Sequence, residues 1–350
     1  MGAKEHVPIP CPSHPTVTIS KVIKAALEED SADRGDVTTL ATIPDGTQAV
    51  ATFLAKSPGV LAGLGVADDV LEAVDPTVEA EWRARDGDRV SAGQVLGVLR
   101  GSARSILVAE RVMLNFMQRM SGIATATAAM VSALEGLPCK VLDTRKTAPG
   151  MRIVDKWAVL IGGGLNHRHG LYDMMLIKDN HIAAAGGVRA AISRGEEYIR
   201  EHGLTGKLGI EVETGTLAEV DEVVDILRTA RARAAEAASG GEGGGASVAP
   251  AGAGAEASPG GDVNGPPDVA VTGSHVRRVM LDNMAKKDPS KEGGVDVSML
   301  AEAVGRLGGL VDTEASGNAT LDSLRTIAAT GVGFVSVGAI THSVTALDIS

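Results

Sequence analysis

The sequence predicts an α/β fold in which parallel strands form an open sheet or a barrel, and two patterns after residue 136 support this. Six short apolar runs each end in a cluster of charged, hydroxyl or glycine residues, near positions 146, 179, 213, 283, 317 and 339. Segments with helical periodicity lie between most of these runs. Helices between strands imply right-handed βαβ crossovers, which make neighbouring strands parallel.

Length and composition limit the possible functions. The 350 residues suffice for two domains or one large α/β barrel, and the 2% aromatic content requires an aliphatic core. The net charge of −11 argues against a broad nucleic-acid surface. Cys11 and Cys139 form no metal-ligand spacing and indicate a reducing compartment. No apolar run reaches membrane-spanning length and no signal is evident, so we expect a cytoplasmic protein, with a plastid or mitochondrion not excluded.

The first part of the chain is expected to form an α/β sandwich. Residues 1–15 have the composition of a flexible tail, and the domain is expected to span residues 16–135. Within it, residues 17–29 predict a short helix, and short β-runs separated by glycines occupy residues 49–101. Residues 110–134 predict a long linking helix whose methionine stripe is typical of a core or an interface.

Two features of this first part bear on function. Residues 86–97 resemble the turn and strand of biotinyl and lipoyl carrier domains, but no lysine occupies the hairpin tip that such carriers need. A structural sandwich is therefore favoured over a carrier. Arg111 is expected near the start of the long helix, where a cation opposes the helix dipole, so we expect another partner to account for it.

The second part, residues 136–350, is expected to form the parallel domain that carries the active site. Helices are predicted at 188–201, 217–231, 296–306 and 321–329, the last capped by Thr320. One segment does not fit: residues 234–273 are rich in Ala, Gly, Ser and Pro and cannot bury enough apolar surface to fold. We expect a disordered insertion at about 232–275, which loop-closure entropy tolerates.

Cationic residues gather where the strands are expected to end. The carboxyl ends of parallel strands open on one face, and ligands bind there. Arg145 and Lys146 follow the first run, Lys178 ends the second, and His167 and Arg168 follow a glycine triplet between them. These charges would repel one another without a ligand, so we predict a site for a small polyanion.

The remaining strand ends carry carboxylates and small residues. Glu213 and Asp282 could act as an acid/base pair, as magnesium ligands or as acceptors for sugar hydroxyls. The last two roles are favoured beside a phosphate. The final two strand ends carry Ser316-Gly317 and Gly338-Ala339, whose backbone N–H groups suit phosphate binding in α/β barrels.

Taken in order, these motifs resemble the quinolinate phosphoribosyltransferase family (nicotinate-nucleotide pyrophosphorylase, carboxylating). The matching motifs are Glu110-Arg111, Asp143-Thr144-Arg145-Lys146-Thr147, Asn166-His167-Arg168, Lys178-Asp179-Asn180-His181, Glu211-Val212-Glu213, Leu281-Asp282-Asn283, Glu314-Ala315-Ser316-Gly317 and Gly338-Ala339-Ile340-Thr341-His342-Ser343. The resemblance runs from about residue 31 to the end of the chain, apart from the insertion.

The resemblance implies a fold, an assembly and a reaction. The fold is an N-terminal α/β sandwich joined to an incomplete, open α/β barrel of parallel strands. The assembly is a homodimer or higher homo-oligomer with shared active sites. The reaction joins quinolinate to phosphoribosyl pyrophosphate, giving nicotinate mononucleotide, pyrophosphate and CO2 in NAD biosynthesis (EC 2.4.2.19), with Mg2+ accompanying the pyrophosphate.

The resemblance also implies residue roles. Substrate carboxylates and pyrophosphate would be held by Arg145, Lys146, Thr147, His167, Arg168 and Lys178, and quinolinate also by Arg111 of the neighbouring subunit. Ser316, Gly317, Gly338 and Ala339 would bind the 5′-phosphate. Glu213 and Asp282 would hold ribose hydroxyls and, through water, magnesium. Together with Lys146 they form the expected catalytic set.

The chemistry of these residues agrees with such roles. Loss of pyrophosphate from an anomeric carbon builds oxocarbenium-like charge, which carboxylates stabilise while cations neutralise the leaving group. A nicotinate or nicotinamide phosphoribosyltransferase would use similar phosphate contacts without decarboxylation, but the number of cations favours a dicarboxylate. A non-catalytic carrier or binding module is the alternative from another class of protein.

Overall fold

The computed structural model describes residues 8–239, 263–265 and 267–350, and they divide into two compact units. The N-terminal unit comprises residues up to 129 together with 146–164 and 338–350. The sheet unit comprises residues 130–145 and 165–337. The division is therefore not sequential, because the chain passes between the units more than once. Among the described residues, no helix is both long and apolar enough to cross a bilayer.

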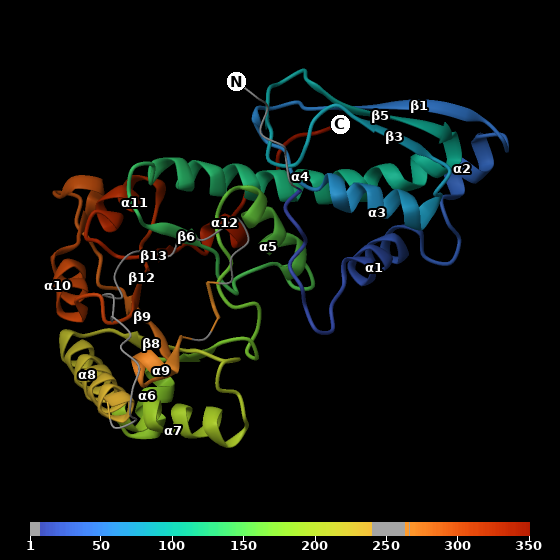
Figure 1. Cartoon of the computed structure of the whole chain (residues 1–350). Coiled ribbons are helices and arrows are strands. Elements are labelled where there is room, and N and C mark those ends of the chain that lie inside the picture. The colour runs from blue at the N-terminus through green and yellow to red at the C-terminus, as the bar shows by residue number, and fades with distance from the viewer. Residues whose placement is uncertain (1–7, 240–262, 266) are drawn as a thin grey trace. The chain divides into compact units, whose positions relative to one another are not determined.

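The N-terminal unit combines small antiparallel sheets with helices (Figure 1). A three-stranded sheet has the order β1-β5-β3, and β2 pairs with β4. The strands are β1 (Gln48–Leu54), β2 (Gly59–Val60), β3 (Glu79–Trp82), β4 (Arg89–Val90) and β5 (Val95–Ser102). The helices that precede or separate them are α1 (Ile19–Ser31), α2 (Val37–Thr42) and α3 (Leu64–Val74). The predicted sandwich is thus confirmed, although α2 and α3 were not anticipated.

Helix α4 (Ala103–Ala133) begins seven residues earlier than the predicted helix. Its first turn is stabilised by the Ser102 hydroxyl, which accepts the Ser105 N–H at 3.3 Å. Arg111 is therefore exposed in the third turn, and the expectation that it opposes the helix dipole in a first turn was wrong. Met113 and Met117 are fully buried, as the core interpretation of the methionine stripe requires.

The sheet unit contains one six-stranded parallel sheet, which confirms the prediction from the six apolar runs. The strands are β6 (Lys140–Leu142), β7 (Met175–Ile177), β8 (Ile210–Thr214), β9 (Val276–Asp282), β12 (Asp312–Ser316) and β13 (Phe334–Ser336). Their order is β6-β13-β12-β9-β8-β7, and every pairing is parallel. Because β6 and β7 lie at opposite edges and do not pair, the barrel is open.

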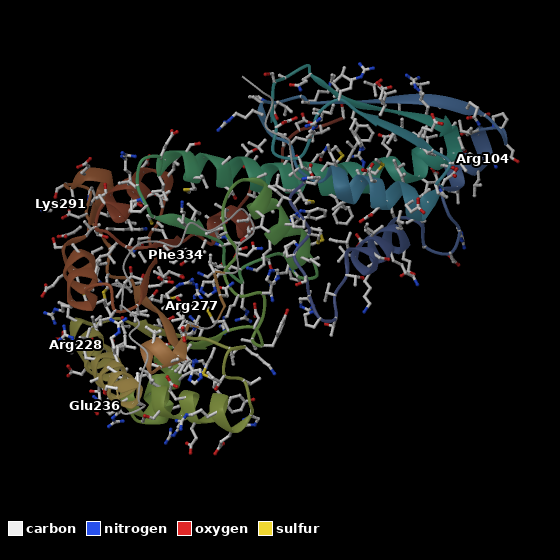
Figure 2. All side chains as sticks on the ribbon, viewed as in Figure 1. Arg104, Arg228, Glu236, Arg277, Lys291 and Phe334 are labelled. Atoms are coloured by element: carbon white, nitrogen blue, oxygen red, sulfur yellow. The ribbon has the colours of Figure 1, made fainter. Side chains whose placement is uncertain are left out.

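Helices connect these strands largely as predicted. The unit contains α6 (Asp179–Ala185), α7 (Val188–Glu201), α8 (Leu217–Ser239), α9 (Val269–Thr272), α10 (Ser298–Leu307) and α11 (Leu321–Ala328), with the short elements β10 (Lys286–Lys287), η1 (Glu292–Gly294) and β11 (Val295–Asp296). The Thr320 hydroxyl caps α11 by accepting the Ser323 N–H. Arg228 and Glu236 of α8 are exposed and lie at the periphery of the unit in Figure 2.

The expected insertion has structured ends. Helix α8 continues to Ser239 and α9 covers Val269–Thr272, so these parts of the range 232–275 are helical rather than irregular. Residues 240–262 and 266 lie outside the described residues. Where the description resumes, the Val263 carbonyl accepts Arg278 Nη2 at 2.8 Å, and Asn264 Nδ2 donates to the Asn166 carbonyl at 3.0 Å.

Candidate active site

The carboxyl ends of neighbouring strands bring four predicted site residues together in the sheet unit. Lys178 follows β7, Glu213 is the penultimate residue of β8, Asp282 ends β9 and Ser316 ends β12. The register pairs Ser316 with Asp282 and pairs Thr214, beside Glu213, with Leu281. The polar edge predicted from the sequence therefore exists in this unit.

Lys178 and Glu213 form an ion pair across two strand ends. The Nζ atom lies 2.7 Å from Oε2, and the Glu213 side chain is 11% exposed. Lys178 is also the N-cap residue of helix α6, and its N–H donates to Nδ1 of His181. The partly buried Glu213 carboxylate therefore has a fixed orientation. Its second oxygen is not used by the contact with Lys178 and can face a ligand.

A constrained turn joins the ends of β9 and β12. Asn283 Nδ2 donates to Asp282 Oδ2 at 2.6 Å, and the Asn283 N–H donates to the Ser316 carbonyl at 2.8 Å. Asn283, Gly317 and Asn318 all have positive φ. A Cβ atom on Gly317 would lie 2.3 Å from Asn283 Oδ1, so only glycine fits there. Backbone held in such conformations is typical of ligand sites.

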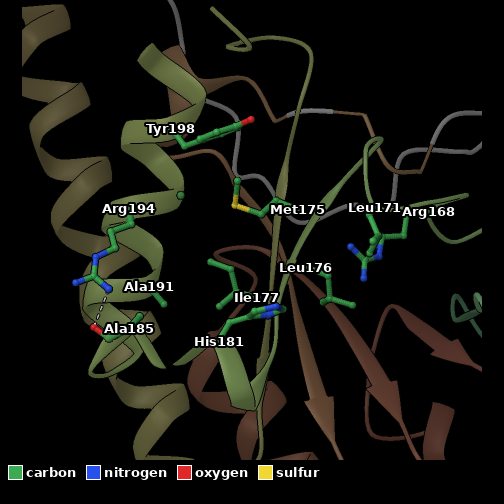
Figure 3. A pocket seen from close by; sticks show the side chains of 11 residues that line it. Arg168, Leu171, Met175, Leu176, Ile177, His181, Ala185, Ala191, Arg194 and Tyr198 are labelled. Carbon is green, nitrogen blue, oxygen red and sulfur yellow. Dashed lines mark hydrogen bonds between the residues drawn. The ribbon is translucent and has the colours of Figure 1, made fainter. Parts of the chain in front are cut away.

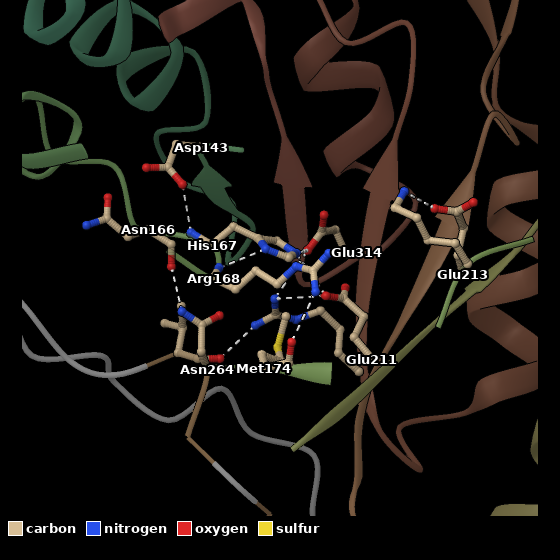
Figure 4. A network of polar contacts seen from close by, with 12 residues as sticks. Asp143, Asn166, His167, Arg168, Met174, Glu211, Glu213, Asn264 and Glu314 are labelled. Carbon is tan, nitrogen blue, oxygen red and sulfur yellow. Dashed lines mark hydrogen bonds and ion pairs between the residues drawn. The ribbon is translucent and has the colours of Figure 1, made fainter. Parts of the chain in front are cut away.

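His167 and Arg168 are buried on the chain segment beside β6 (Figure 4). The His167 N–H donates to Asp143 Oδ1, and the Arg168 N–H donates to Nδ1 of His167, both at 2.8 Å. Arg168 Nη1 donates to the Met174 carbonyl at 3.1 Å. Burial, and then the nearby charge of Arg145, lower the pKa of Arg168. The guanidinium groups of Arg145 and Arg168 are therefore close enough for their charges to interact, as expected at a site that binds anions.

Behind His167 lies a pair of fully buried carboxyl groups, Glu211 and Glu314, which we call the acid pair. Nε2 of His167 is 2.8 Å from Glu211 Oε2 and 3.5 Å from Glu314 Oε2. Nη1 of the buried Arg278 is 3.2 Å from Glu314 Oε2. Burial and the charge of Glu211 raise the pKa of Glu314 to about 7, and burial also raises the pKa of Glu211.

No role for the acid pair or for Arg278 was predicted from the sequence. The three residues lie inside strands β8, β9 and β12, and Glu211 directly opposes Arg278 in the register. A charged residue within an otherwise apolar parallel strand was the signal that could have found them, because such strands are buried on both faces. Their pairing across strands could not be foreseen without the strand order.

Glu314 makes a testable contribution to stability. Its folded pKa of about 7 exceeds the ordinary value of 4.5, so the folded state binds the extra proton and unfolding becomes easier as pH rises from about 4.5 to 7. The expected loss is about 3 kcal/mol of unfolding free energy. Urea unfolding of both proteins at pH 5 and pH 8 should show that the unfolding free energy of wild type falls with pH relative to that of Glu314→Gln. A difference independent of pH would contradict the shifted pKa.

The other predicted site residues lie in the N-terminal unit: Arg111, Lys146, Thr147, Gly338 and Ala339. Thr147 Oγ1 accepts a hydrogen bond from Arg152 Nε at 3.1 Å, in α5 (Arg152–Ile161). Gly338 and Ala339 begin the short helix α12 (Ala339–His342). A Cβ on Gly338 would lie 3.1 Å from Cδ of Lys146, so the absence of a side chain there leaves space for the lysine.

A buried ion pair that the sequence analysis missed supports this part of the site. Arg119 of α4 binds both oxygens of the fully buried Asp155 at 2.8 and 2.7 Å, and donates to the Thr341 carbonyl. Asp155 also accepts the Ala148 N–H, and Thr341 Oγ1 donates to the Lys146 carbonyl at 2.9 Å. The loop that carries Lys146 is therefore anchored to α4, α5 and α12 at once.

Two further features of the structure do not belong to the predicted polyanion site. In the glycine triplet, a Cβ on Gly162 would lie 2.6 Å from the Ala124 carbonyl and one on Gly164 2.7 Å from Thr127 Cγ2, so these glycines allow close packing on α4. A cavity of about 400 Å³ along β7, α6 and α7 (Figure 3) includes only Arg168 among the predicted site residues. We do not assign the polyanion site to it.

Comparisons with known proteins identify the family that this chain resembles. The sequence model of the quinolinate phosphoribosyl transferase C-terminal domain matches residues 123–234 and 268–350, and that of the N-terminal domain matches 36–121. Quinolinate phosphoribosyltransferase [decarboxylating] 1 of Nicotiana glauca is 46% identical, covering 100% of this chain and 86% of the relative. The chloroplastic nicotinate-nucleotide pyrophosphorylase [carboxylating] of Arabidopsis thaliana is 48% identical over 97% of this chain and 84% of its own length. The crystal structure of NadC from Streptococcus pyogenes has a TM-score of 0.73 and 33% identity, covering 95% of each chain.

Proposed function

The chain belongs to the quinolinate phosphoribosyltransferase family, and we propose that the residues predicted from its sequence bind the substrates of that family's reaction. The enzyme transfers the phosphoribosyl group of phosphoribosyl pyrophosphate to quinolinate and releases pyrophosphate and CO2, a pentosyl transfer of NAD biosynthesis (EC 2.4.2.19). The observation that carries the site assignment is the Lys178–Glu213 pair beside Asp282 at one sheet edge.

We assign Glu213 and Asp282 to the ribose. As pyrophosphate leaves, positive charge develops at the anomeric carbon, and two carboxylates at neighbouring strand ends would stabilise it. Lys178 holds Glu213 in one orientation at 2.7 Å, so little reorganisation is needed when the charge appears. Neither carboxylate has to act as a nucleophile. Positioning and electrostatics supply the rate in this proposal.

We assign the cations to the substrate anions. Arg145 and Arg168 would bind the quinolinate carboxylates, while Lys146 and Lys178 would neutralise the leaving pyrophosphate. After CO2 loss, the same charges would stabilise the electron pair left on the pyridine ring. His167 was predicted to contact the substrate, but both of its nitrogens face protein groups, so we assign it instead to holding the backbone at Arg168. Thr147 would complete this set as a hydroxyl donor.

The 5′-phosphate is assigned to Ser316, Gly317, Gly338 and Ala339. The turn at Gly317, which a side chain would obstruct, and the space left by Gly338 support this assignment. Small residues let backbone N–H groups approach phosphate oxygens closely.

The donors at the sheet edge fit magnesium bound through the pyrophosphate and through water. Glu213 and Asp282 provide hard carboxylate oxygens, but one oxygen of Glu213 already binds Lys178 and one of Asp282 binds Asn283. These contacts favour indirect over direct coordination, since Mg2+ retains several waters at such sites. When bound, the metal would neutralise part of the pyrophosphate charge.

We also propose a homodimer or higher homo-oligomer in which Arg111 reaches the quinolinate of the neighbouring subunit. Its exposure on α4 supports a contact outside its own chain. The cytoplasm remains our proposed location, although relatives from Oryza sativa and Nicotiana tabacum are labelled chloroplastic and mitochondrial. Fractionation of cells that express the tagged chain would test the location.

Product analysis tests the reaction. The purified protein is incubated with phosphoribosyl pyrophosphate and either quinolinate or nicotinate, with and without Mg2+. We expect CO2 and nicotinate mononucleotide from quinolinate only, and only when Mg2+ is present. Equal use of nicotinate would favour the non-decarboxylating alternative, and binding without turnover would favour a non-catalytic module.

A pair of deletions tests the insertion. Replacing residues 240–262 with a shorter Gly/Ser linker should leave turnover within about twofold of wild type, because the length of a flexible loop has a small entropic effect. Extending the deletion through residue 265 removes the carbonyl that binds the buried Arg278, and should destabilise the protein by about 1–3 kcal/mol. Steady-state assays and urea unfolding of both variants would measure this. An inactive variant without residues 240–262 that still unfolds like wild type would show that the insertion itself has a function.

A further inference from the structure

A basic groove lies between helices α7 and α8 of the sheet unit. Its cavity has a volume of about 320 Å³, which is within the range of small-molecule sites. Ser274 and His275 line one end of the groove, immediately before strand β9 begins. Asp282, which we assigned to the ribose, is the last residue of β9. This end of the groove therefore lies at the opposite end of β9 from the candidate active site.

The alignment of the two helices brings two arginines to the same level of the groove. Each helix lines the groove with residues three or four positions apart, which share one face: Arg189, Ser193, Glu196 and Arg200 on α7, and Ile226, Thr229, Ala230 and Arg233 on α8. The Arg189 N–H donates to Glu222 Oε1 at 3.1 Å, which places residues 33 positions apart beside each other. Both helices follow neighbouring parallel strands and run in the same direction. Arg200 and Arg233 are therefore also level.

Arg200 and Arg233 form a pair of cations without an anionic partner in the part of the chain that the structure describes. Both side chains are exposed, and neither forms an ion pair with a carboxylate there. Arg200 is oriented by its Nε, which donates to the Glu196 carbonyl at 3.2 Å. A guanidinium group can donate two parallel N–H bonds to a phosphate, so two facing groups suit this anion particularly well.

The acidic residue that lines this groove, Glu196, is already used by the protein. Its Oε1 accepts the Ser274 hydroxyl at 2.6 Å and the His275 N–H at 2.8 Å, and its other oxygen contacts Nδ1 of His275. Ser274 and His275 are both buried, so the Glu196 carboxylate is directed into the wall of the groove. With Arg189 the lining has three guanidinium groups to this one carboxylate, although the whole chain has a net charge of −11. An anionic ligand would balance the excess.

The middle of the groove is apolar. Ile192 of α7 and Ile226 of α8 line it about two helical turns before Arg200 and Arg233, which corresponds to roughly 10 Å along the helices. Ile226 is half-buried and keeps part of its surface for a ligand. Apolar side chains beside a few charged anchors are typical of sites for small organic molecules. The groove thus suits a ligand with an anionic end and an apolar ring.

We propose that the groove is a second ligand site, which binds a phosphate ester of a small ring-bearing molecule, such as a mononucleotide. The phosphate lies between Arg200 and Arg233, and the ring packs on Ile226. None of the residues that line the groove is assigned to the transfer reaction. Binding in the groove therefore does not require the enzymatic assignment to be correct.

Calorimetric titration of the full chain with nicotinate mononucleotide tests this site. We expect two molecules bound per wild-type chain, one at the candidate active site and one in the groove. In Arg200→Ala/Arg233→Ala the groove should lose about 100-fold in affinity, because two charge-assisted contacts are removed, and only the other molecule should remain bound. The kcat and both KM values should stay within about twofold of wild type. Inorganic phosphate should bind the groove at least about tenfold more weakly than the nucleotide, because it lacks the ring.

Arg228→Ala/Arg231→Ala is the matched control. It removes the same charge from the sheet unit at two arginines of α8 that do not line the groove. We expect this variant to bind two molecules, as wild type does. If the candidate active site does not bind the nucleotide, wild type should bind one molecule and Arg200→Ala/Arg233→Ala none, so an error in the proposed function would be recognised separately.

Four results would overturn the proposal. The first is a wild-type chain that binds one molecule and still binds it in Arg200→Ala/Arg233→Ala. The second is an equal loss in the control variant, which would reduce the effect to net charge. The third is inorganic phosphate that binds as tightly as the nucleotide, which would exclude the contact with the ring. The fourth is a groove that binds the nucleotide only after residues 240–262 are replaced by a linker, which would assign the groove to the chain's own insertion.

Discussion

Replacing Lys146 with alanine is expected to lower kcat/KM for phosphoribosyl pyrophosphate by about 100-fold. The exposed ammonium extends from a loop that is anchored by Arg119, Asp155 and Thr341. A charge-assisted contact to phosphate contributes about 1.5–3 kcal/mol, and more if it strengthens as the pyrophosphate leaves. Steady-state kinetics with each substrate varied in turn would measure the loss.

Lys140→Ala provides the matched control for that result. Lys140 is an exposed lysine at the start of β6, six positions before Lys146, and is not among the predicted site residues. We expect it to retain wild-type kinetics. Near-wild-type kinetics in Lys146→Ala, or the same loss in both variants, would remove Lys146 from the site.

Mixing two inactive variants should restore activity if Arg111 acts in the neighbouring subunit. Arg111→Ala and Lys146→Ala subunits, allowed to exchange, form heterodimers in which one site keeps Lys146 from its own chain and Arg111 from its neighbour. Half of the dimers are then mixed and each has one intact site of two, so activity should reach about a quarter of wild type. Activity after subunit exchange, followed by native mass spectrometry, measures this recovery.

A second mixture gives the opposite result under the same hypothesis. An Arg111→Ala/Lys146→Ala double variant should inhibit wild type when present in excess, because it withdraws Arg111 from the wild-type site. If each site uses its own Arg111, the first mixture stays inactive and the second does not inhibit. That combination of results would contradict the shared site.

The sheet could be predicted because its strands are buried on both faces. Such strands appear as apolar runs that end at charged or glycine residues, and all six were found with their polar ends. Helices α7, α10 and α11 were predicted from amphipathic periodicity. The 10-residue α5 and the 7-residue α6 were missed because they begin among the glycine, proline and charged residues taken for loops.

The buried ion pairs that support the site could not be predicted, because their partners are far apart in the sequence. Asp155 binds Arg119, 36 positions earlier, and Arg278 binds Glu314, 36 positions later. Neither spacing follows a helical or strand period, so no local pattern marks the partners. The proposed substrate contacts were easier to predict from the sequence, because they lie at strand ends that the apolar runs define. The start of α4 was missed because Ser102 was not identified as its cap.

The pairing of β6 has a consequence for synthesis on the ribosome. β6 is an edge strand, and its single strand neighbour is β13, with Lys140 opposite Phe334. Nearly two hundred residues must therefore be translated before the first strand of this sheet can dock beside the last. Nascent chains that stop before residue 334 leave that strand without its neighbour, together with the basic loop that follows it. A chain that ends a few residues after β13 should therefore dock β6 far better than a chain that ends before β13.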